Sequence, residues 1–150
     1  MRKRIENEMK CELPAISANE QTARMLAAAF AMQADPTAEQ LADLKTAVSE
    51  AVTNAIVHGY RNRQGKIYIG ARLYADGTVW IRVRDTGCGI EDIEKAMTPL
   101  FTTAPEEERA GLGFAVMEAF CDRVAVSSRP GRGTSVILEK KMSGRTEAMG

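Results

Sequence analysis

The sequence has no excess of either charge, few cysteines and a single histidine, and each shortage excludes a class of protein. Lysine plus arginine and aspartate plus glutamate balance at 20 each, so the basic surface needed for non-specific nucleic-acid binding is not expected. The three cysteines lie far apart and never form a CxxC pair, so they predict reduced thiols rather than a disulfide framework or a zinc site. A lone histidine, His58, cannot supply the two-histidine site of a metalloprotease.

Long apolar runs are also missing. No segment approaches the roughly 18 apolar residues of a membrane span, and the charged start of the chain has no signal-peptide core. We therefore expect a cytoplasmic protein without membrane association. A hydrophobic content of 45% in 150 residues is enough for one core. The prediction is a single domain over 1–150, with loose termini at about 1–9 and 141–150.

Two helices are predicted in the first 60 residues, each opened by a capping box. The first box is Ser17-Ala-Asn-Glu20, and its helix runs to about Gln33. The second box is Thr37-Ala-Glu-Gln40, and its helix runs to Gly59, a favourable stop. A strand from Lys10 to Ile16 precedes them and belongs at a sheet edge, because it contains a proline.

The remainder of the chain predicts two hairpins. Apolar residues alternate over 67–73 and again over 79–83, around an Asp-Gly turn. Strands grouped together, with helices able to cover one face, predict an α+β fold: a two-layer sandwich with a mixed, mostly antiparallel sheet covered on one face by helices. The other expected elements are a short helix over 91–97, an unusually long loop over 99–110, a helix from Gly111 to about Cys121, and a last hairpin of Val124–Ser127 with Ser135–Leu138.

One stripe of the second predicted helix is polar. Glu50, Asn54 and His58 follow one another at i, i+4 and i+8, beside the apolar arc that should face the sheet. On one interpretation, they are ordinary solvent-facing residues. Ala47 and Val57 share that side of the helix, however, and a face that mixes apolar residues with Glu and Asn favours a partly covered ligand site.

A carboxylate beside a side-chain amide suits one chemistry well. The amide oxygen of Asn54 can ligate Mg²⁺, a hard cation that prefers oxygen ligands. The carboxylate of Glu50 can accept a proton from an attacking hydroxyl or orient it. The two residues are therefore the candidate chemical centre of a partly covered polar site.

Glycine-rich segments stand at two predicted element ends. Asp85-x-Gly87-x-Gly89 leaves a strand, and Gly111-x-Gly113 enters a helix. Glycine pairs mostly mark turns, but together these suggest backbone that approaches a ligand, with phosphates near a helix N-terminus. Neither GxxxxGK[ST] nor GxGxxG occurs, so a P-loop or Rossmann site is not expected. Asp85 is either a turn residue or an acceptor for the exocyclic amino group of a base.

Five segments, taken in chain order, resemble the motifs of one known family. Together they resemble the GHKL (Bergerat-fold) ATPases and, more narrowly, the sporulation anti-sigma factors that are also serine protein kinases. The resemblance covers about Leu13 to Leu138, and the ordered set is far more specific than any single motif. The segments are Glu50-Ala-Val-Thr-Asn54-Ala-Ile-Val-His58-Gly59-Tyr60, Asp85-Thr-Gly87-Cys-Gly89-Ile90, Pro99-Leu-Phe-Thr102-Thr103, Glu108-Arg109-Ala-Gly111-Leu-Gly113-Phe114 and Gly133-Thr134.

The resemblance implies a Bergerat ATP-binding fold and a role for each matching residue. Glu50 would be the general base, Asn54 the Mg²⁺ ligand, and Asp85 the partner of the adenine amino group. The other residues implied in binding ATP or ADP, as the base pocket, the lid and the phosphate contacts, are His58, Gly87, Gly89, Ile90, Thr102, Thr103, Arg109, Gly111, Leu112, Gly113, Phe114 and Thr134.

Partners are implied in the same way. Arg24 matches the family's position for docking the sigma factor and its antagonist, although the sequence alone favours a solvated helix charge. The family holds an RNA polymerase sigma factor inactive, phosphorylates a serine of a small anti-anti-sigma protein, and works as a homodimer. Direct contact with nucleic acid is not implied.

Three alternatives remain beside this interpretation. The chain could be a stress-response anti-sigma kinase that acts on a different sigma factor, although the Thr-Thr lid and the His58-Gly59-Tyr60 ending favour the sporulation form. It could be the catalytic domain of a histidine kinase, but no phosphoacceptor histidine precedes His58. It could also be a module that binds a nucleotide without turnover, and the position of Glu50 is an argument against this.

Overall fold

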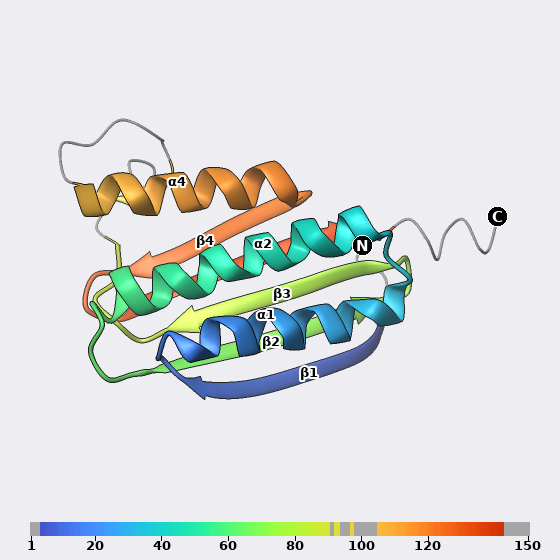
Figure 1. Ribbon diagram of the computed structural model, residues 1–150, viewed down its shortest axis with the longest axis horizontal. Coiled ribbons are helices and arrows are strands. Elements are labelled where there is room, and N and C mark those ends of the chain that lie inside the picture. Colours follow the sequence, from blue (N-terminus) through green and yellow to red (C-terminus); the bar gives the residue numbers. More distant parts are fainter. Residues whose placement is uncertain (1–3, 91, 94–96, 98–104, 143–150) are drawn as a thin grey trace.

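The strands form one antiparallel sheet, and the helices lie on one of its faces (Figure 1). A computed structural model describes residues 4–90, 92–93, 97 and 105–142, without the side chains of 105–111. Within these residues, the sheet has five strands in the order β1-β2-β3-β5-β4. The strands are β1 (Ile5–Pro14), β2 (Lys66–Tyr74), β3 (Thr78–Asp85), β4 (Arg123–Arg129) and β5 (Gly133–Lys141), and the main helices are α1 (Ala18–Ala31), α2 (Ala38–Asn54) and α4 (Pro105–Phe120).

The two-layer α+β prediction is confirmed. Every pair of neighbouring strands among the described residues is antiparallel, so the sheet lacks the parallel pairing that the expected mixed sheet allowed for. Both predicted hairpins form, as β2 with β3 and as β4 with β5. In the helical layer, α2 lies between α1 and α4 and packs against both (Figure 1).

The edge strand β1 begins at Ile5, and not at Lys10, so it includes residues that were expected to form a loose terminus. Its inward side chains, such as Met9 and Cys11, pack against the core. On the outer side, Glu8 lies 3.8 Å from Arg72 of β2. Alternation between core contacts and exposed ion pairs therefore extends the strand well beyond the segment that the sequence indicated.

Only one of the two predicted capping boxes forms. At α2, the Thr37 hydroxyl accepts from the Gln40 amide at 3.1 Å, and the Gln40 side chain accepts from the Thr37 amide at 2.9 Å. At α1, Ser17 already has helical angles, φ −55° and ψ −36°, and its side chain caps nothing. The box expected at Ser17 was wrong, because a capping residue needs an extended backbone to aim its oxygen at the free amides.

The second helix ends at Gly59 as predicted, but its last turn, η2 (Ala55–Gly59), is a wider π turn. The Tyr60 amide closes it on the Ala55 carbonyl at 2.9 Å. Arg61 and Asn62 then take left-handed angles, with φ of 54° and 60°. The chain thereby reverses sharply between the end of α2 and the start of β2.

The helix α4 begins at Pro105, so two expectations about this region were wrong. Part of the long loop predicted over 99–110 is helical, and Gly111 and Gly113 lie inside the helix instead of opening it. Proline suits a first helical turn, because the amide that it lacks would have no partner there. Most of the helix predicted over 91–97 falls outside the described residues.

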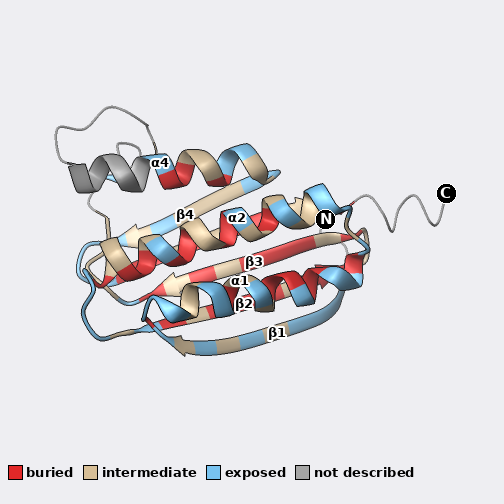
Figure 2. Cartoon of the chain, viewed as in Figure 1, coloured by how far each residue is buried: buried red, intermediate tan, exposed pale blue. Residues whose placement is uncertain are grey.

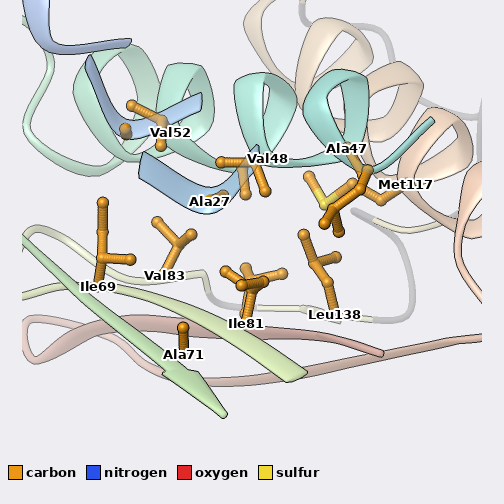
Figure 3. Close-up of a cluster of buried hydrophobic side chains, with 14 of the residues drawn as sticks. Ala27, Ala47, Val48, Val52, Ile69, Ala71, Ile81, Val83, Met117 and Leu138 are labelled. Carbon is orange, nitrogen blue, oxygen red and sulfur yellow. The ribbon is translucent and has the colours of Figure 1, made fainter. Parts of the chain in front are cut away.

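The core lies between the helices and the sheet, as the close-up of its centre shows (Figure 3). Buried residues concentrate on β2, β3 and the inner sides of the helices (Figure 2). The helices contribute mainly alanine and valine at this layer, so α1 and α2 can lie close to the sheet. Residues of the core include Ala27, Ala47, Val48, Val52, Ile69, Ile81, Val83, Met117 and Leu138.

Within the described part of the chain, no helix covers the outer face of the sheet (Figure 1), yet this face contains a buried tryptophan. Trp80 is only 6% exposed, because the guanidinium groups of Arg72 and Arg82 stack on its ring, 4.2 and 5.8 Å from the centroid. Arg84 covers Tyr68 in the same way at 4.2 Å. Cation–π stacking thus shields the aromatic rings on this side.

Candidate functional site

The side chains of Glu50 and Asn54 both lie against Gly113 of α4. A Cβ atom placed on Gly113 would be 3.2 Å from Oε2 of Glu50 and 3.1 Å from Nδ2 of Asn54. Both side chains are half-buried. The polar stripe of α2 is therefore covered by a second helix, as the mixture of apolar and polar residues on this side of α2 suggested, and a larger residue than glycine at 113 would crowd it.

The Asn54 amide has an unused hydrogen-bonding group. Its Nδ2 atom is buried and finds no hydrogen-bond partner within the described part of the chain. The oxygen and nitrogen of an amide can exchange places by rotation of the group, so this position can equally present an oxygen. An unpaired buried amide is costly, which makes a ligand at this point plausible on physical grounds.

The donor set here fits Mg²⁺ better than a metal held entirely by protein. Among the described residues, no group of three or more His, Cys, Asp or Glu side chains lies close enough together to hold a metal ion. Mg²⁺ commonly takes one or two protein oxygens and completes its octahedron with water and phosphate oxygens. One amide oxygen from Asn54 is consistent with that arrangement.

Asp85 forms a second polar point, at the end of β3. Its side chain is buried, at 5% exposure for the residue, and its Oδ1 atom accepts a hydrogen bond from the Gly87 amide at 2.9 Å. Burial raises the pKa of this carboxyl above its ordinary value, and the backbone amides of Gly87 and Thr134 and the charge of Arg84 offset part of the rise. Asp85 is thus a buried acceptor that also forms an Asx turn with the Gly87 amide, so it has the turn role of the simpler interpretation as well as the burial of a ligand-binding group.

The end of the α2–η2 helix contacts Asp85 directly. A Cβ atom on Gly59 would lie 2.9 Å from both Cγ and Oδ2 of the Asp85 carboxyl. The Cys88 amide donates to the Gly59 carbonyl at 2.9 Å, and the Cys88 thiol donates to the His58 carbonyl at 3.2 Å. One continuous helical element therefore carries Glu50 and Asn54 and also packs against the segment that holds Asp85.

Glycine is required at both Gly87 and Gly89 for steric reasons. A Cβ atom on Gly87 would overlap the carbonyl of Gly59, and one on Gly89 would overlap the carbonyl of Arg129. Gly89 also has a φ of 75°, a left-handed angle that glycine adopts without strain. These two residues let the segment after β3 lie between η2 and the β4–β5 turn.

Thr134 and Ile90 are brought to the same place by a residue that the sequence analysis did not single out. The Ser128 hydroxyl donates to the Gly133 carbonyl at 2.9 Å and accepts from the Ile90 amide at 2.8 Å. Its single hydrogen is thereby used, so Thr134, at 2.9 Å, must donate to it. The position of Ser128, two residues beyond Val126 on the inward face of β4, is the signal that could have identified it.

The remaining predicted site residues differ in their exposure, and some of them lie outside the described residues. Phe114 is 1% exposed and packs in the core, whereas Leu112 is 46% exposed, so only the second presents its side chain at the surface. His58 is half-buried. Gly111 lies within α4, Thr102 and Thr103 fall outside the described residues, and so does the side chain of Arg109.

A groove of about 460 Å³ runs between α1 and α2 and joins Arg24 to Glu50. Nε of Arg24 and Oγ of Ser49 are buried in it without a hydrogen-bond partner among the described residues. Arg24 as a whole is half-buried, so its charged side chain lies partly in the groove and partly in solvent. The groove is lined by Glu20, Arg24, Ala42, Lys45, Thr46, Ser49, Glu50 and Thr53.

Comparison with known proteins identifies the family to which this combination of residues belongs. The profile of the histidine kinase-like ATPase domain matches residues 13–140. The anti-sigma F factor of Bacillus subtilis (strain 168) is 51% identical over 140 residues, which cover 93% of this chain and 95% of that protein. The chain belongs to the anti-sigma F factor family. Another member, from Thermoanaerobacter sp. (strain X514), is 56% identical over 134 residues, covering 89% of this chain and 93% of its own.

Solved structures place this anti-sigma F factor family member within the wider fold. The RsbU and RsbW domains of Rv1364c from Mycobacterium tuberculosis superpose with a TM-score of 0.65 at 23% identity, over 91% of this chain and 32% of that one. The histidine kinase domain of the Erythrobacter litoralis EL346 blue-light activated kinase gives 0.54 at 22% identity, over 73% and 48%. These similarities confirm the fold of a kinase-like ATPase domain. Within the described residues, none of the helices is long and apolar enough to cross a membrane.

Proposed function

We propose that this chain is an ATP- and Mg²⁺-dependent protein-serine kinase that also binds and inhibits a sporulation sigma factor. In this proposal it phosphorylates, and thereby inactivates, an anti-anti-sigma antagonist, and it works in the cytoplasm as a homodimer. The observation that supports the kinase activity best is the meeting of Glu50 and Asn54 beside Gly113, with an unpaired Asn54 amide. The names of the relatives support the sigma-factor role.

Adenine recognition is assigned to Asp85 and its surroundings. A buried carboxylate that is already bonded to the Gly87 amide retains acceptor capacity for the exocyclic amino group of adenine. Gly87, Gly89, Ile90 and Thr134 would form the walls of this base pocket. An acceptor that is desolvated in this way discriminates strongly, since a base without a donor at that point would leave it unpaired.

Phosphoryl transfer is assigned to the other end of the same helix. Bound ATP and Mg²⁺ would supply the phosphoryl group and the charge that neutralises it. The Asn54 oxygen would hold the metal, and the Glu50 carboxylate would accept the proton of the attacking serine hydroxyl. The residues of the lid and the phosphate contacts would be Thr102, Thr103, Arg109, Gly111, Leu112 and Gly113, and His58 and Phe114 would belong to the nucleotide site without an assigned contact.

Partner docking is assigned to the groove that joins Arg24 to Glu50. A protein bound at Arg24 along this groove would lie close to the proposed general base. Unpaired polar atoms of Arg24 and Ser49 provide buried hydrogen-bonding groups for such a partner. The same surface would serve the sigma factor and the antagonist, which is consistent with mutually exclusive binding.

The test is the transfer of labelled phosphate from ATP to a candidate anti-anti-sigma protein, followed by identification of the phosphorylated residue as serine. We expect Glu50→Gln to abolish transfer and to leave ATP binding largely intact, because only the proton acceptor is lost. The matched control is Glu39→Gln, an exposed position in the first turn of the same helix. Transfer that persists in Glu50→Gln at the wild-type rate would remove Glu50 from this role, and binding without any transfer in the wild type would favour a non-catalytic module.

A further inference from the structure

Tyr60 stands between the end of α2–η2 and the segment after β3, and the proposed function gives it no role. The residue follows η2 directly and is 9% exposed. Its ring lies so close to Gly65 that a Cβ atom there would overlap the ring atoms. The left-handed residues Arg61 and Asn62 turn the chain back to make this contact. The ring is therefore held tightly in place.

The Tyr60 hydroxyl joins two backbone segments that do not otherwise bond to each other at this point. It donates to the Lys66 carbonyl at 2.5 Å and accepts from the Thr86 amide at 2.8 Å. The Thr86 hydroxyl lies 3.2 Å away. Because the single hydrogen of Tyr60 is directed to Lys66, the Thr86 hydroxyl must be the donor in this third bond.

Thr86 is the residue immediately after Asp85. The last ladder position of β3 is Asp85 itself, opposite Thr134 of β5, so the bond of the Thr86 amide to Tyr60 is the first one that holds the chain after it leaves the strand. The next amide, of Gly87, is the one that bonds to the Asp85 carboxyl. A shift of Thr86 would therefore move both the Asp85 carboxyl and its hydrogen-bond donor.

We infer that Tyr60 is a positioning residue that determines base selectivity by holding the Asp85 segment through its hydroxyl group. The inference rests on the proposed role of Asp85 in recognising adenine. Tyr60 does not touch the nucleotide in this account; it acts through Thr86. Loss of the hydroxyl would leave the Thr86 amide and the Lys66 carbonyl without their partner and would allow the segment to adopt other positions.

The test is Tyr60→Phe, which keeps the ring and removes one oxygen atom. We expect the KM for ATP to rise about tenfold while kcat at saturating ATP stays within about twofold, because Glu50 and Asn54 are not displaced. Preference for ATP over GTP should fall by a similar factor. A purely structural role would lower the melting temperature without changing the ratio of KM values for the two nucleotides.

Tyr74→Phe is the matched control. Tyr74 is the last residue of β2 and is 4% exposed. The substitution therefore also removes the hydroxyl oxygen of a buried tyrosine, but at the end of β2 opposite to Lys66. We expect it to keep the wild-type preference for ATP. If Tyr60→Phe and Tyr74→Phe show the same preference as the wild type, the inference is overturned.

Two further substitutions distinguish a failure of this inference from a failure of the proposed function. Gly65→Ala keeps the hydroxyl but pushes the Tyr60 ring away, so it should reproduce the loss of selectivity; retention of the full preference would contradict the inference. Asp85→Asn should abolish the preference for ATP altogether. If Asp85→Asn leaves it unchanged, the base-recognition proposal fails; if Asp85→Asn abolishes it and Tyr60→Phe does not weaken it, only the role of Tyr60 fails.

Discussion

Replacement of Gly113 by alanine should separate the stability of this protein from its activity. Gly113 lies in the interior of α4, where glycine is about 1 kcal/mol less favourable than alanine. For a domain of this size, that gain alone would raise the melting temperature by about 2–4 °C. On helix propensity alone, Gly113→Ala is a stabilising substitution.

The surroundings of Gly113 oppose that gain at the proposed catalytic centre. The new methyl group would lie 3.1 Å from Nδ2 of Asn54 and 3.2 Å from Oε2 of Glu50, whereas comfortable contacts lie at about 3.5–4.0 Å. Relief requires a shift of roughly 0.3–0.5 Å, at a cost of about 0.5–1.5 kcal/mol if a side chain leaves its rotamer. Since a misplacement of about 1 Å can cost about 100-fold in rate, we expect kcat to fall about tenfold.

The assay pairs thermal unfolding with labelled phosphate transfer. For Gly113→Ala, the gain and the cost nearly cancel, so we expect a melting temperature within about 2 °C of the wild-type value, with the tenfold loss of kcat. The control is Gly70→Ala in β2, where the added Cβ would meet its nearest neighbour, Trp80, at an ordinary 3.4 Å. That variant should be slightly stabilised and fully active. Unchanged kcat in Gly113→Ala would refute the placement of Glu50 and Asn54 at the reacting centre.

Three further substitutions test the remaining assignments. Asp85→Asn removes a carboxyl whose pKa is raised by burial, so ionisation favours the unfolded chain, and the stability of the variant relative to the wild type should increase from about pH 4 upward and then level off above the raised pKa. Thermal unfolding between pH 4 and 8 checks the sign, and a decrease over this range would contradict it. Asn54→Ala should lose the Mg²⁺-dependent part of the ATP affinity, and a variant whose calorimetric affinity still responds to Mg²⁺ as the wild type does would exclude Asn54 as the ligand. Arg24→Glu should weaken sigma-factor binding in a pull-down while the ATP affinity stays normal, and undiminished capture would remove Arg24 from the docking surface.

Local sequence patterns predicted which helices and strands form more accurately than they predicted where these begin and end. The boxes at Ser17 and Thr37 are equivalent as strings, yet only Thr37 has the extended backbone that capping requires. At the start of α1, the Asn19 side chain instead donates to the Pro14 carbonyl at 2.9 Å. How the chain arrives from a neighbouring strand decides such cases, and a short window of sequence does not contain that information.

The glycines of α4 show a second limit of the same kind. Gly111 and Gly113 were predicted to open a helix and to bring its N-terminus close to a ligand. Gly113 instead lies inside the helix, where a Cβ atom would come within 3.1–3.2 Å of the side chains of Glu50 and Asn54. A tertiary contact between residues more than 50 positions apart can therefore offset a local propensity of about 1 kcal/mol.

The polar residues of the site were found from the sequence because two independent signals agreed. Spacing along a helix brought out Glu50 and Asn54, and the resemblance gave them roles. Ser128 had neither signal. Its bonds to Gly133 and Thr134 lie within the β4–β5 hairpin, and its bond to Ile90 exists only when the segment after β3 is folded against that hairpin.

Because of the π turn at Ala55–Gly59, the number of residues in this helix affects the proposed nucleotide site. It inserts a wider turn between Asn54 and Gly59, the residue on which the Asp85 carboxyl rests. If the helix became regular here without losing a residue, Gly59 would rotate by about 100° relative to the sheet. A residue bulkier than glycine would then face Asp85. An active member of the family that lacks the π turn should therefore also lack one residue between Asn54 and Gly59, which would keep the glycine opposite Asp85.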